Sequence, residues 1–411
     1  MPANTVLLLE AFGNSGEVLA DAIRAEGFGV AVATHQQLYD NYSPCLKSKI
    51  DYLIIIDYAD EQVVDHIIDA AQHHHVVGVL TGWEFFTGLC AEVAARLGLP
   101  GNDPSRSDAG RSKWAMAKAF DFGGVRHATT VHAADAVSLH GQIAAAVLDY
   151  PVVVKPTENA GSVGVTVVHR SSELDAAVAA AQAFPREFPH DIELDDSVLA
   201  QAYVGGREFS VESLASGGEI QHQAITEKAT TEGAFRAETG HTIPAALTQE
   251  ESTALTDAAT AGLRALGFTN GAAHIEIKLC NGDAWVIEAG LRPAGDHIVK
   301  LVTHATGTDF ARAYVRAVTG GPLPPPRPLQ SQAGVRFLTP DTAGEVSAAT
   351  ICGPIPHGVI ERGLLVDAGD HVGAVADNVS RLGYVIATAN DRDQLEQALH
   401  AGLKSLDVSL R

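Results

Sequence analysis

Two glutamates, Glu276 and Glu288, flank a turn in segment 272–296, which reads AAHIEIKLCNGDAWVIEAGLRPAGD. The Asn-Gly pair at its centre is a strong hairpin signal. With a three-residue loop at 281–283, the two glutamates face each other on one side of the hairpin and apolar residues pair on the other. A two-residue loop would instead place Glu276 opposite Ile287 and mix the two faces. We therefore expect the longer loop, with Glu276 opposite Glu288.

Opposed carboxylates of this kind need a cation between them or a shared proton. Directly opposed residues on paired strands have Cβ atoms roughly 4.5–5.5 Å apart, so two charged carboxylates repel. Mg²⁺ prefers carboxylate oxygens that it shares with substrate phosphates. Arg292 follows in a turn with glycine and proline, where it offsets charge or binds the reacting group. A solvated pair on an exposed sheet face and a proton-sharing pair, as in glycoside hydrolysis, are the alternatives.

A second chemical segment, residues 151–168, reads PVVVKPTENAGSVGVTVV. Two apolar runs enclose Lys155, Gly161 and Gly164. The usual phosphate loops lead from a strand into a helix. This segment predicts a strand-to-strand hairpin, with the lysine on the incoming strand and glycines that let the tip move. A proton-sharing carboxylate pair would leave this lysine–glycine loop without a role, so we favour a metal and phosphate site.

The elements around these segments predict a parallel α/β layer followed by mixed structure. Short apolar runs alternate with helical patterns near the N-terminus; the runs are 5–9, 52–56 and 76–80. The first turn, AFGNSG, lacks the G-x-G-x-x-G spacing of a dinucleotide site. Turn-rich residues 98–108 and proline-rich residues 320–330 mark boundaries. A helix carrying Lys113 is expected after the first boundary.

Composition bounds the remaining possibilities. A chain of 411 residues is expected to form about two to four domains. The formal charge of −22 disfavours a nucleic-acid partner. No apolar run reaches the ~18 residues of a membrane span, and the N-terminal residues lack signal-peptide features, which predicts a cytoplasmic protein. The four cysteines are far apart, as expected for reduced thiols.

Together these segments resemble the ATP-grasp superfamily of carboxylate–amine ligases. HIEIKL followed by IEAGLRPAGD looks most like the bacterial L-amino-acid ligases of the bacilysin-synthetase type, which join two amino acids into a dipeptide. The resemblance covers nearly the whole chain and implies an α/β (α+β) protein with the ATP-grasp fold. The implied units are a Rossmann-like pre-ATP-grasp domain (1–105), a small subdomain with the glycine flap (106–197), a large subdomain with the magnesium site (198–322) and a β-rich C-terminal subdomain (323–411).

The resemblance also implies roles for individual residues. Arg292 would stabilise the acyl phosphate and the tetrahedral intermediate, and Glu276 and Glu288 would bind Mg²⁺. The residues implied in ATP binding are Lys113, Lys155, Gly161, Ser162, Val163, Gly164, Gln201, Ala202, Val204 and Glu208. Residues that similar segments bring toward the substrate, with a solvated loop as the alternative for the middle three, are Glu212, Lys228, Glu238, His241 and Gly295. Two positions depart from the common pattern, Gly290 in place of an asparagine and Gln201 in place of a glutamate.

The activity that the resemblance implies is an ATP- and Mg²⁺-dependent ligase. It would form an amide between an amino acid, or a related carboxylic acid, and the amine of an amino acid, through an acyl phosphate, with release of ADP and phosphate. Members of the family are often dimers, which makes a homodimer a candidate assembly. Two alternatives stay open: a fold relative that acts on bicarbonate or formate, and a nucleotide-binding sensor that has lost catalysis.

Overall fold

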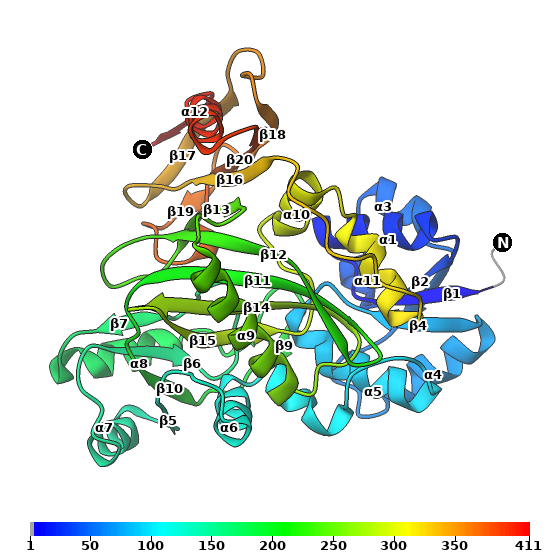
Figure 1. Ribbon diagram of the computed structural model, residues 1–411, viewed down its shortest axis with the longest axis horizontal. Helices are drawn as coiled ribbons and strands as arrows, with labels where there is room; N and C mark the ends of the chain where they lie inside the picture. The colour runs from blue at the N-terminus through cyan, green and yellow to red at the C-terminus, as the bar shows by residue number, and fades with distance from the viewer. Residues whose placement is uncertain (1–3) are drawn as a thin grey trace.

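The N-terminal part is a parallel α/β layer, as its alternation of apolar runs and helical patterns predicts. A computed structural model describes residues 4–411 (Figure 1). The first sheet has the order β3-β2-β1-β4, with β1 Thr5–Leu9, β2 Gly29–Thr34, β3 Tyr52–Ile55 and β4 Val76–Leu80. Val6 and Leu8 enter one apolar cluster and Leu7 and Leu9 another. This strand is therefore buried on both faces, as parallel strands usually are.

Helices and short helical turns complete this layer. They are α1 Asn14–Ala25, α2 Gln36–Asp40, α3 Pro44–Lys49, α4 Val63–His73, α5 Thr87–Leu97 and the 3₁₀ turns η1 Glu84–Phe86 and η2 Pro104–Gly110. Helix α6 Lys113–Gly123 then carries Lys113 in its first turn, as predicted, and Ser112 caps it by accepting from the backbone of Ala115. Across residues 4–411, no helix combines the length and apolar character needed to traverse a bilayer.

A small antiparallel sheet follows, in the order β5-β10-β6-β7. Its strands are β5 Thr130–Ala133, β6 Val152–Pro156, β7 Thr166–Val168 and β10 Val198–Ala202, and helices α7 Ala136–Ala145 and α8 Leu174–Ala181 pack on one face, with the turn η3 Ser171–Glu173 before α8. Strands β6 and β7 pair antiparallel, which confirms the predicted hairpin. We call its connecting residues 157–165 the flap. A two-stranded ribbon, β8 Arg186–Glu187 and β9 Ile192–Glu193, precedes β10.

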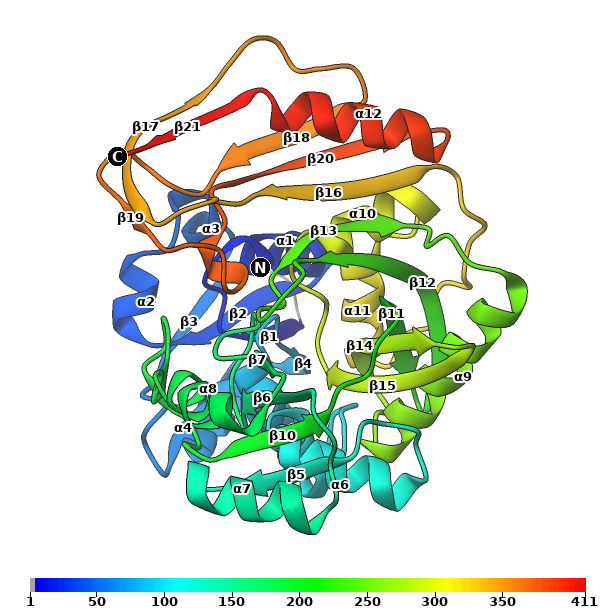
Figure 2. The same ribbon diagram turned by 90° about the vertical axis from the view of Figure 1, so that its left-hand side faces the viewer.

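The large sheet has eight strands in the order β15-β14-β11-β12-β13-β16-β20-β18. Their bounds are β11 Arg207–Ser216, β12 Glu219–Thr230, β13 Glu238–Ile243, β14 Gly271–Cys280, β15 Asp283–Gly290, β16 Gln332–Leu338, β18 Val359–Leu364 and β20 Gly383–Ala389. The sheet runs without a break across position 323, because β13 pairs with β16. Figure 2 shows this sheet above the small one, with β14 and β15 toward the small sheet.

Helices cover the large sheet and join it to the N-terminal layer. Helix α9 Gln249–Ala265 packs on β14 and β15, and α10 Ile298–Thr306 and α11 Phe310–Val318 share an apolar cluster with β1 and β16. The remaining elements are β17 Gly344–Ile351, β19 His371–Val372, η4 Asn378–Ser380, α12 Arg392–Leu403 and β21 Leu406–Leu410. Helix α12 lies against β16 and β20.

The β14–β15 hairpin has the expected glutamate pair but reaches it by a different register. Glu276 lies opposite Glu288, as predicted. The predicted three-residue loop is wrong: Cys280 pairs with Asp283, so the turn is the two residues Asn281-Gly282, both with positive φ. That conformation is the one Asn-Gly favours. The extra residue is taken up by a β-bulge at Ile287, so Ile277 lies opposite Val286 and not Ile287.

Candidate active site

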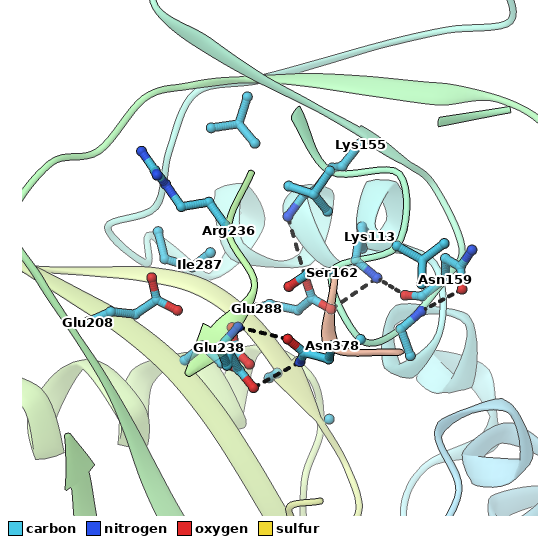
Figure 3. A pocket seen from close by; sticks show the side chains of 18 of the residues that line it. Lys113, Lys155, Asn159, Ser162, Glu208, Arg236, Glu238, Ile287, Glu288 and Asn378 are labelled. Atoms are coloured by element: carbon cyan, nitrogen blue, oxygen red, sulfur yellow. Dashed lines mark hydrogen bonds and ion pairs between the residues drawn. The ribbon is translucent and has the colours of Figure 1, made fainter. Parts of the chain in front are cut away.

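A cavity of about 240 Å³ lies between the small sheet and the large sheet, beside the flap (Figure 3). Its walls come from α6, β6, the flap, the connection between β10 and β11, and the β14–β15 hairpin. Asn378, from the C-terminal segment, also lines it. Residues from segments far apart in the sequence therefore meet around one cavity.

Two buried lysines contact Glu288, one from α6 and one from β6. Lys113 Nζ lies 3.0 Å from Glu288 Oε1, and Lys155 Nζ lies 3.4 Å from Oε2. Lys113 also donates to the carbonyl of Asn159 in the flap, at 2.5 Å. Burial alone would raise the pKa of Glu288, but Lys113 and Lys155 hold it below its usual value. Glu288 is therefore a carboxylate surrounded by cations.

Glu276 is neutralised by other groups. Lys228 Nζ lies 2.7 Å from Glu276 Oε1, and His274 Nε2 lies 3.3 Å from the same oxygen. The other ring nitrogen of His274 lies 3.0 Å from Glu212. Burial would lower the pKa of His274, but Glu212 and Glu276 raise it to about 10, so the ring is protonated and donates to both carboxylates.

Glu212 stands behind this cavity wall. It is buried, and its carboxylate accepts from Ser210, Thr226 and His274. The structure thus places this predicted substrate residue next to His274 and outside the residues that line the cavity. Its contact with the cavity is therefore indirect, through the imidazole of His274, which lines the cavity.

Lys228 links three carboxylates. The sequence predicts that it approaches the substrate or lies in a solvated loop, whereas the structure places it on strand β12. It contacts Glu238, lies 2.7 Å from Glu276 and lies 3.6 Å from Glu208. Burial would lower its pKa, but Glu238 and the other two carboxylates raise the pKa well above its usual value. This lysine is fully engaged by protein groups and lies beneath the cavity wall.

Glu238 and Asp296 line the cavity, and the buried His241 contacts both of them from behind the lining residues. His241 Nε2 lies 3.2 Å from Asp296 and 3.6 Å from Glu238, and the possible ligand atoms of the three residues lie within 4.8 Å of one another. Arg381 already binds Asp296 at 2.6 Å, and Lys228 contacts Glu238. Both carboxylates of this group are therefore paired with cations of the protein.

All but one of the residues predicted to bind the nucleotide line the cavity. Lining residues among them are Lys113, Lys155, Gly161, Ser162, Val163, Gln201, Ala202, Val204 and Glu208. The side chain of Gln201 donates to Thr130 in β5, at 2.9 Å. Gly164 is the exception and packs against α8, where an added Cβ would lie 3.0 Å from Ala181. It fits because only glycine combines this approach with a φ of +72°.

Arg292 lines the cavity and pairs with the N-terminal layer. Its Nη2 lies 2.5 Å from Glu84 Oε2, and its Nε donates to the same oxygen at 3.1 Å. Glu84 lies in η1 and is buried. Gly295, predicted at the substrate pocket, also lines the cavity. One wall of the site therefore depends on the N-terminal layer.

Sequence reasoning missed several cavity residues, among them six with charged or polar side chains, and three of these six had a signal. They are Glu84, Arg236, His274, Lys278, Asp296 and Asn378. His274 and Lys278 lie two residues either side of Glu276, so strand alternation places all three on one face. Arg236 lies between Lys228 and Glu238, which are both predicted to approach the substrate. Glu84 and Asn378 come from distant segments and had no local signal.

Comparisons with known proteins agree with this arrangement. Residues 148–300 match an ATP-grasp domain, and residues 336–411 match the L-amino acid ligase C-terminal domain 2. The alanine–anticapsin ligase of Bacillus subtilis is 25% identical over 320 residues, which cover 70% of this chain and 67% of that protein.

Solved structures share the fold. An L-amino acid ligase from Bacillus licheniformis superposes with a TM-score of 0.82 at 19% identity, over 99% of this chain and 98% of that one. A biotin carboxylase–β-γ-ATP complex from Campylobacter jejuni gives a TM-score of 0.71 at 18% identity, over 99% and 92%. The chain therefore contains an ATP-grasp domain and an L-amino acid ligase C-terminal domain, and it is similar in sequence and fold to ATP-dependent amino-acid ligases.

Proposed function

We propose that this protein joins the carboxyl group of an amino acid, or a related acid, to the amine of an amino acid and releases ADP and phosphate. The observation that carries the proposal is the opposed pair Glu276 and Glu288, set in a cavity where Lys113 and Lys155 both reach Glu288. The name of the relative from Bacillus subtilis, alanine–anticapsin ligase, supports an amino acid as one substrate.

Glu276 and Glu288 fit a magnesium ion. They are register partners on adjacent strands, and both line the cavity. Carboxylate oxygens shared with substrate phosphates are the ligands that Mg²⁺ prefers. We propose that these two residues hold the ion, which would neutralise phosphate charge. Lys113 and Lys155 would then exchange Glu288 for phosphate oxygens.

The chemistry needs charge neutralisation and exclusion of water. A carboxylate is a poor electrophile toward an amine, and transfer of the γ-phosphoryl group makes an acyl phosphate with a good leaving group. We propose that Lys113 and Lys155 bind the phosphates and that Arg292 stabilises the acyl phosphate and the tetrahedral intermediate. The flap would exclude water while the acyl phosphate exists.

The remaining cavity residues would divide between nucleotide and substrates. We propose that the flap residues Gly161, Ser162 and Val163 cover the phosphates. Gln201, Ala202 and Val204 would line the adenine pocket, and Glu208 would bind the ribose hydroxyls. Glu238 and Gly295 would face the substrates. His241, Lys228 and Glu212, which lie behind the lining residues, would orient the carboxylates and the imidazole of His274 that line the cavity.

The test is a phosphate-release assay with ATP, Mg²⁺ and all pairs of amino acids, with mass spectrometry of the products. Phosphate release that requires both an acid and an amine, with a dipeptide product, supports the proposal. Separate arms with bicarbonate and with formate test the other reaction class. Turnover that depends on either of these, or none with any amino-acid pair, would contradict the proposal.

Replacing Glu288 examines the site within the same assay. We expect Glu288→Gln to lower phosphate release by about 100-fold or more, because a charged group at the reacting phosphates is lost. Nucleotide affinity, measured by calorimetry without Mg²⁺, should change little. Glu61→Gln, at an exposed position before α4, is the matched control and should behave as wild type. Unchanged turnover in Glu288→Gln would sink the metal assignment.

A further inference from the structure

A turn of the C-terminal segment reaches the flap. Asn378 is the first residue of η4, and Asp377 precedes it as the cap. The carboxylate of Asp377 accepts from the backbone of Val379 at 3.0 Å and of Ser380 at 3.1 Å. This capped turn presents Asn378 to the cavity in one orientation, as Figure 3 shows.

Asn378 uses its backbone N–H and both ends of its amide group to connect two other segments. Its backbone N–H donates to the carbonyl of Gly161 in the flap, at 3.0 Å. Its Oδ1 accepts from the backbone of Glu238 at 2.8 Å, and its Nδ2 donates to Glu238 Oε2 at 3.0 Å. A single residue therefore ties the flap to the start of β13.

Arg381 fixes the same turn to the substrate side of the cavity. Its guanidinium lies 2.6 Å from Asp296, donates to the carbonyl of Glu238 at 3.0 Å and stacks on Phe337 at 3.6 Å. The side chain is buried. Because three groups hold Arg381, the turn that carries Asn378 is anchored independently of the flap.

We propose that Asn378 is a positioning residue that latches the flap in its closed position and couples closure to Glu238 on the substrate side of the cavity. The inference rests on the proposed function in that the flap covers the nucleotide. Glu238 bonds Asn378 through its backbone N–H and its carboxylate, so a substrate that orders Glu238 also orders the latch. The C-terminal segment thereby takes part in keeping water from the acyl phosphate.

Two substitutions separate the bonds of the latch. Asn378→Ala removes both bonds to Glu238 and keeps the N–H that reaches Gly161. Asn378→Pro also removes that N–H. Proline suits the first position of a helical turn, and Asp377 is extended, with φ −150° and ψ −178°, as a residue before proline should be. Val379→Ala, in the same turn with a side chain that is 77% exposed, is the matched control.

The primary measurement is amide hydrogen exchange of the flap, residues 157–165, with a non-hydrolysable ATP analogue bound. We expect exchange to rise about tenfold in Asn378→Ala, which loses the bonds that hold Asn378 to Glu238, and further in Asn378→Pro, which also loses the bond to the flap. Val379→Ala should match wild type. Melting temperatures verify that each variant is folded. Flap exchange in both Asn378 variants equal to wild type overturns the proposal.

A second measurement is the ratio of ATP consumed to amide product formed. The latch predicts that Asn378→Ala raises this ratio several-fold, since an open flap admits water to the acyl phosphate. If wild type forms no amide with any substrate pair, the proposed function fails while the exchange result still judges the latch. A ratio equal to wild type, with faster flap exchange, would overturn the coupling to substrate and leave only the contact.

Discussion

At the residue scale, the two glutamates of the hairpin are neighbours with separate sets of cations. Lys113 and Lys155 serve Glu288, and Lys228 and His274 serve Glu276. A buried carboxylate without a partner would be costly. The lysines therefore let this site form before any metal or nucleotide binds, and their contacts are available for exchange when phosphates arrive.

His297, at the start of α10, gives the protein a pH-dependent contribution to stability. Its ring stacks on Tyr384 with centroids 4.3 Å apart, and burial, with help from Lys300, lowers its pKa to about 4 from the usual 6.5. The folded protein favours the neutral ring, so this contribution is present above about pH 6.5 and is lost as pH falls toward 4.

We expect His297→Asn to remove that dependence. Asparagine does not titrate and tolerates the positive φ of this position, which is 64°. At about pH 7.5 the variant should melt lower by on the order of 1–2 °C, because the stack is lost. The difference in melting temperature should shrink as pH falls from 6.5 to 4. Scanning calorimetry at several pH values checks this, and a constant difference would contradict it.

At the element scale, the bulge in β15 falls where this strand begins to line the cavity. Ile287 and Glu288 both line the cavity, while Val286 before them is buried in the core. A hydrophobic side chain and the carboxylate that we propose to bind Mg²⁺ thus come from consecutive positions. The two-residue turn and the bulge at Ile287 together keep Glu276 opposite Glu288.

Ile287→Ala tests whether this bulged residue contributes to nucleotide binding. Figure 3 places Ile287 between Arg236 and Glu288. Removing three carbons from an apolar contact should weaken ATP affinity by roughly tenfold. Affinity for Mg²⁺ in the presence of ADP should stay within about twofold, since Glu276 and Glu288 keep their pairing. Calorimetry measures both, and equal losses would assign the bulge to the metal instead.

The sequence predicts the local part of this arrangement and misses what depends on distant segments. Hairpins at 152–168 and 271–290 follow from turn residues and apolar alternation, which act between near neighbours. The bulge could not be predicted from the sequence. An extra residue in the turn and an extra residue in the strand both leave Glu276 opposite Glu288. The bonds of Asn378 to Glu238 span 140 positions, and no local pattern specifies such a meeting.

At the scale of the whole molecule, the small sheet is attached to the N-terminal layer through the ribbon of β8 and β9. His190, between these strands, has a fully buried side chain. It packs edge to face on Trp83 at 4.6 Å and on Phe86 at 5.0 Å, and its Nδ1 lies 2.7 Å from Glu187. This contact therefore fixes the ribbon that precedes β10 against the N-terminal layer.

His190→Ala should therefore lower global stability more than an ordinary histidine replacement. Removing a buried ring leaves a cavity against Trp83 and Phe86, at a cost of about 2–4 kcal/mol. His357→Ala, at an exposed position, should cost less than about 0.5 kcal/mol. Denaturant unfolding monitored by tryptophan fluorescence measures both. Equal midpoints for the two variants would show that the ribbon contributes nothing to holding the layers together.

We propose that the chain comprises four units near 1–105, 106–197, 198–322 and 323–411, although the sheets do not respect every boundary. Strand β10, at 198–202, completes the small sheet. Strand β16 continues the large sheet from the last unit. The units are therefore segments of sequence joined by shared sheets.

That shared sheet sets a rule for recombining related ligases. Strand β13 pairs with β16 from Gly240–Arg336 to Ile243–Ala333, while the proline-rich stretch 320–330 between them looks like a convenient crossover point. A chimera joined there would pair a strand of one parent with a strand of the other. Their facing side chains would not match, and each strand would leave an exposed sheet edge until the two had paired during folding. A chimera that folds should therefore take β13 and β16 from the same parent. The crossover point then belongs outside the large sheet and not at the boundary between two sequence units.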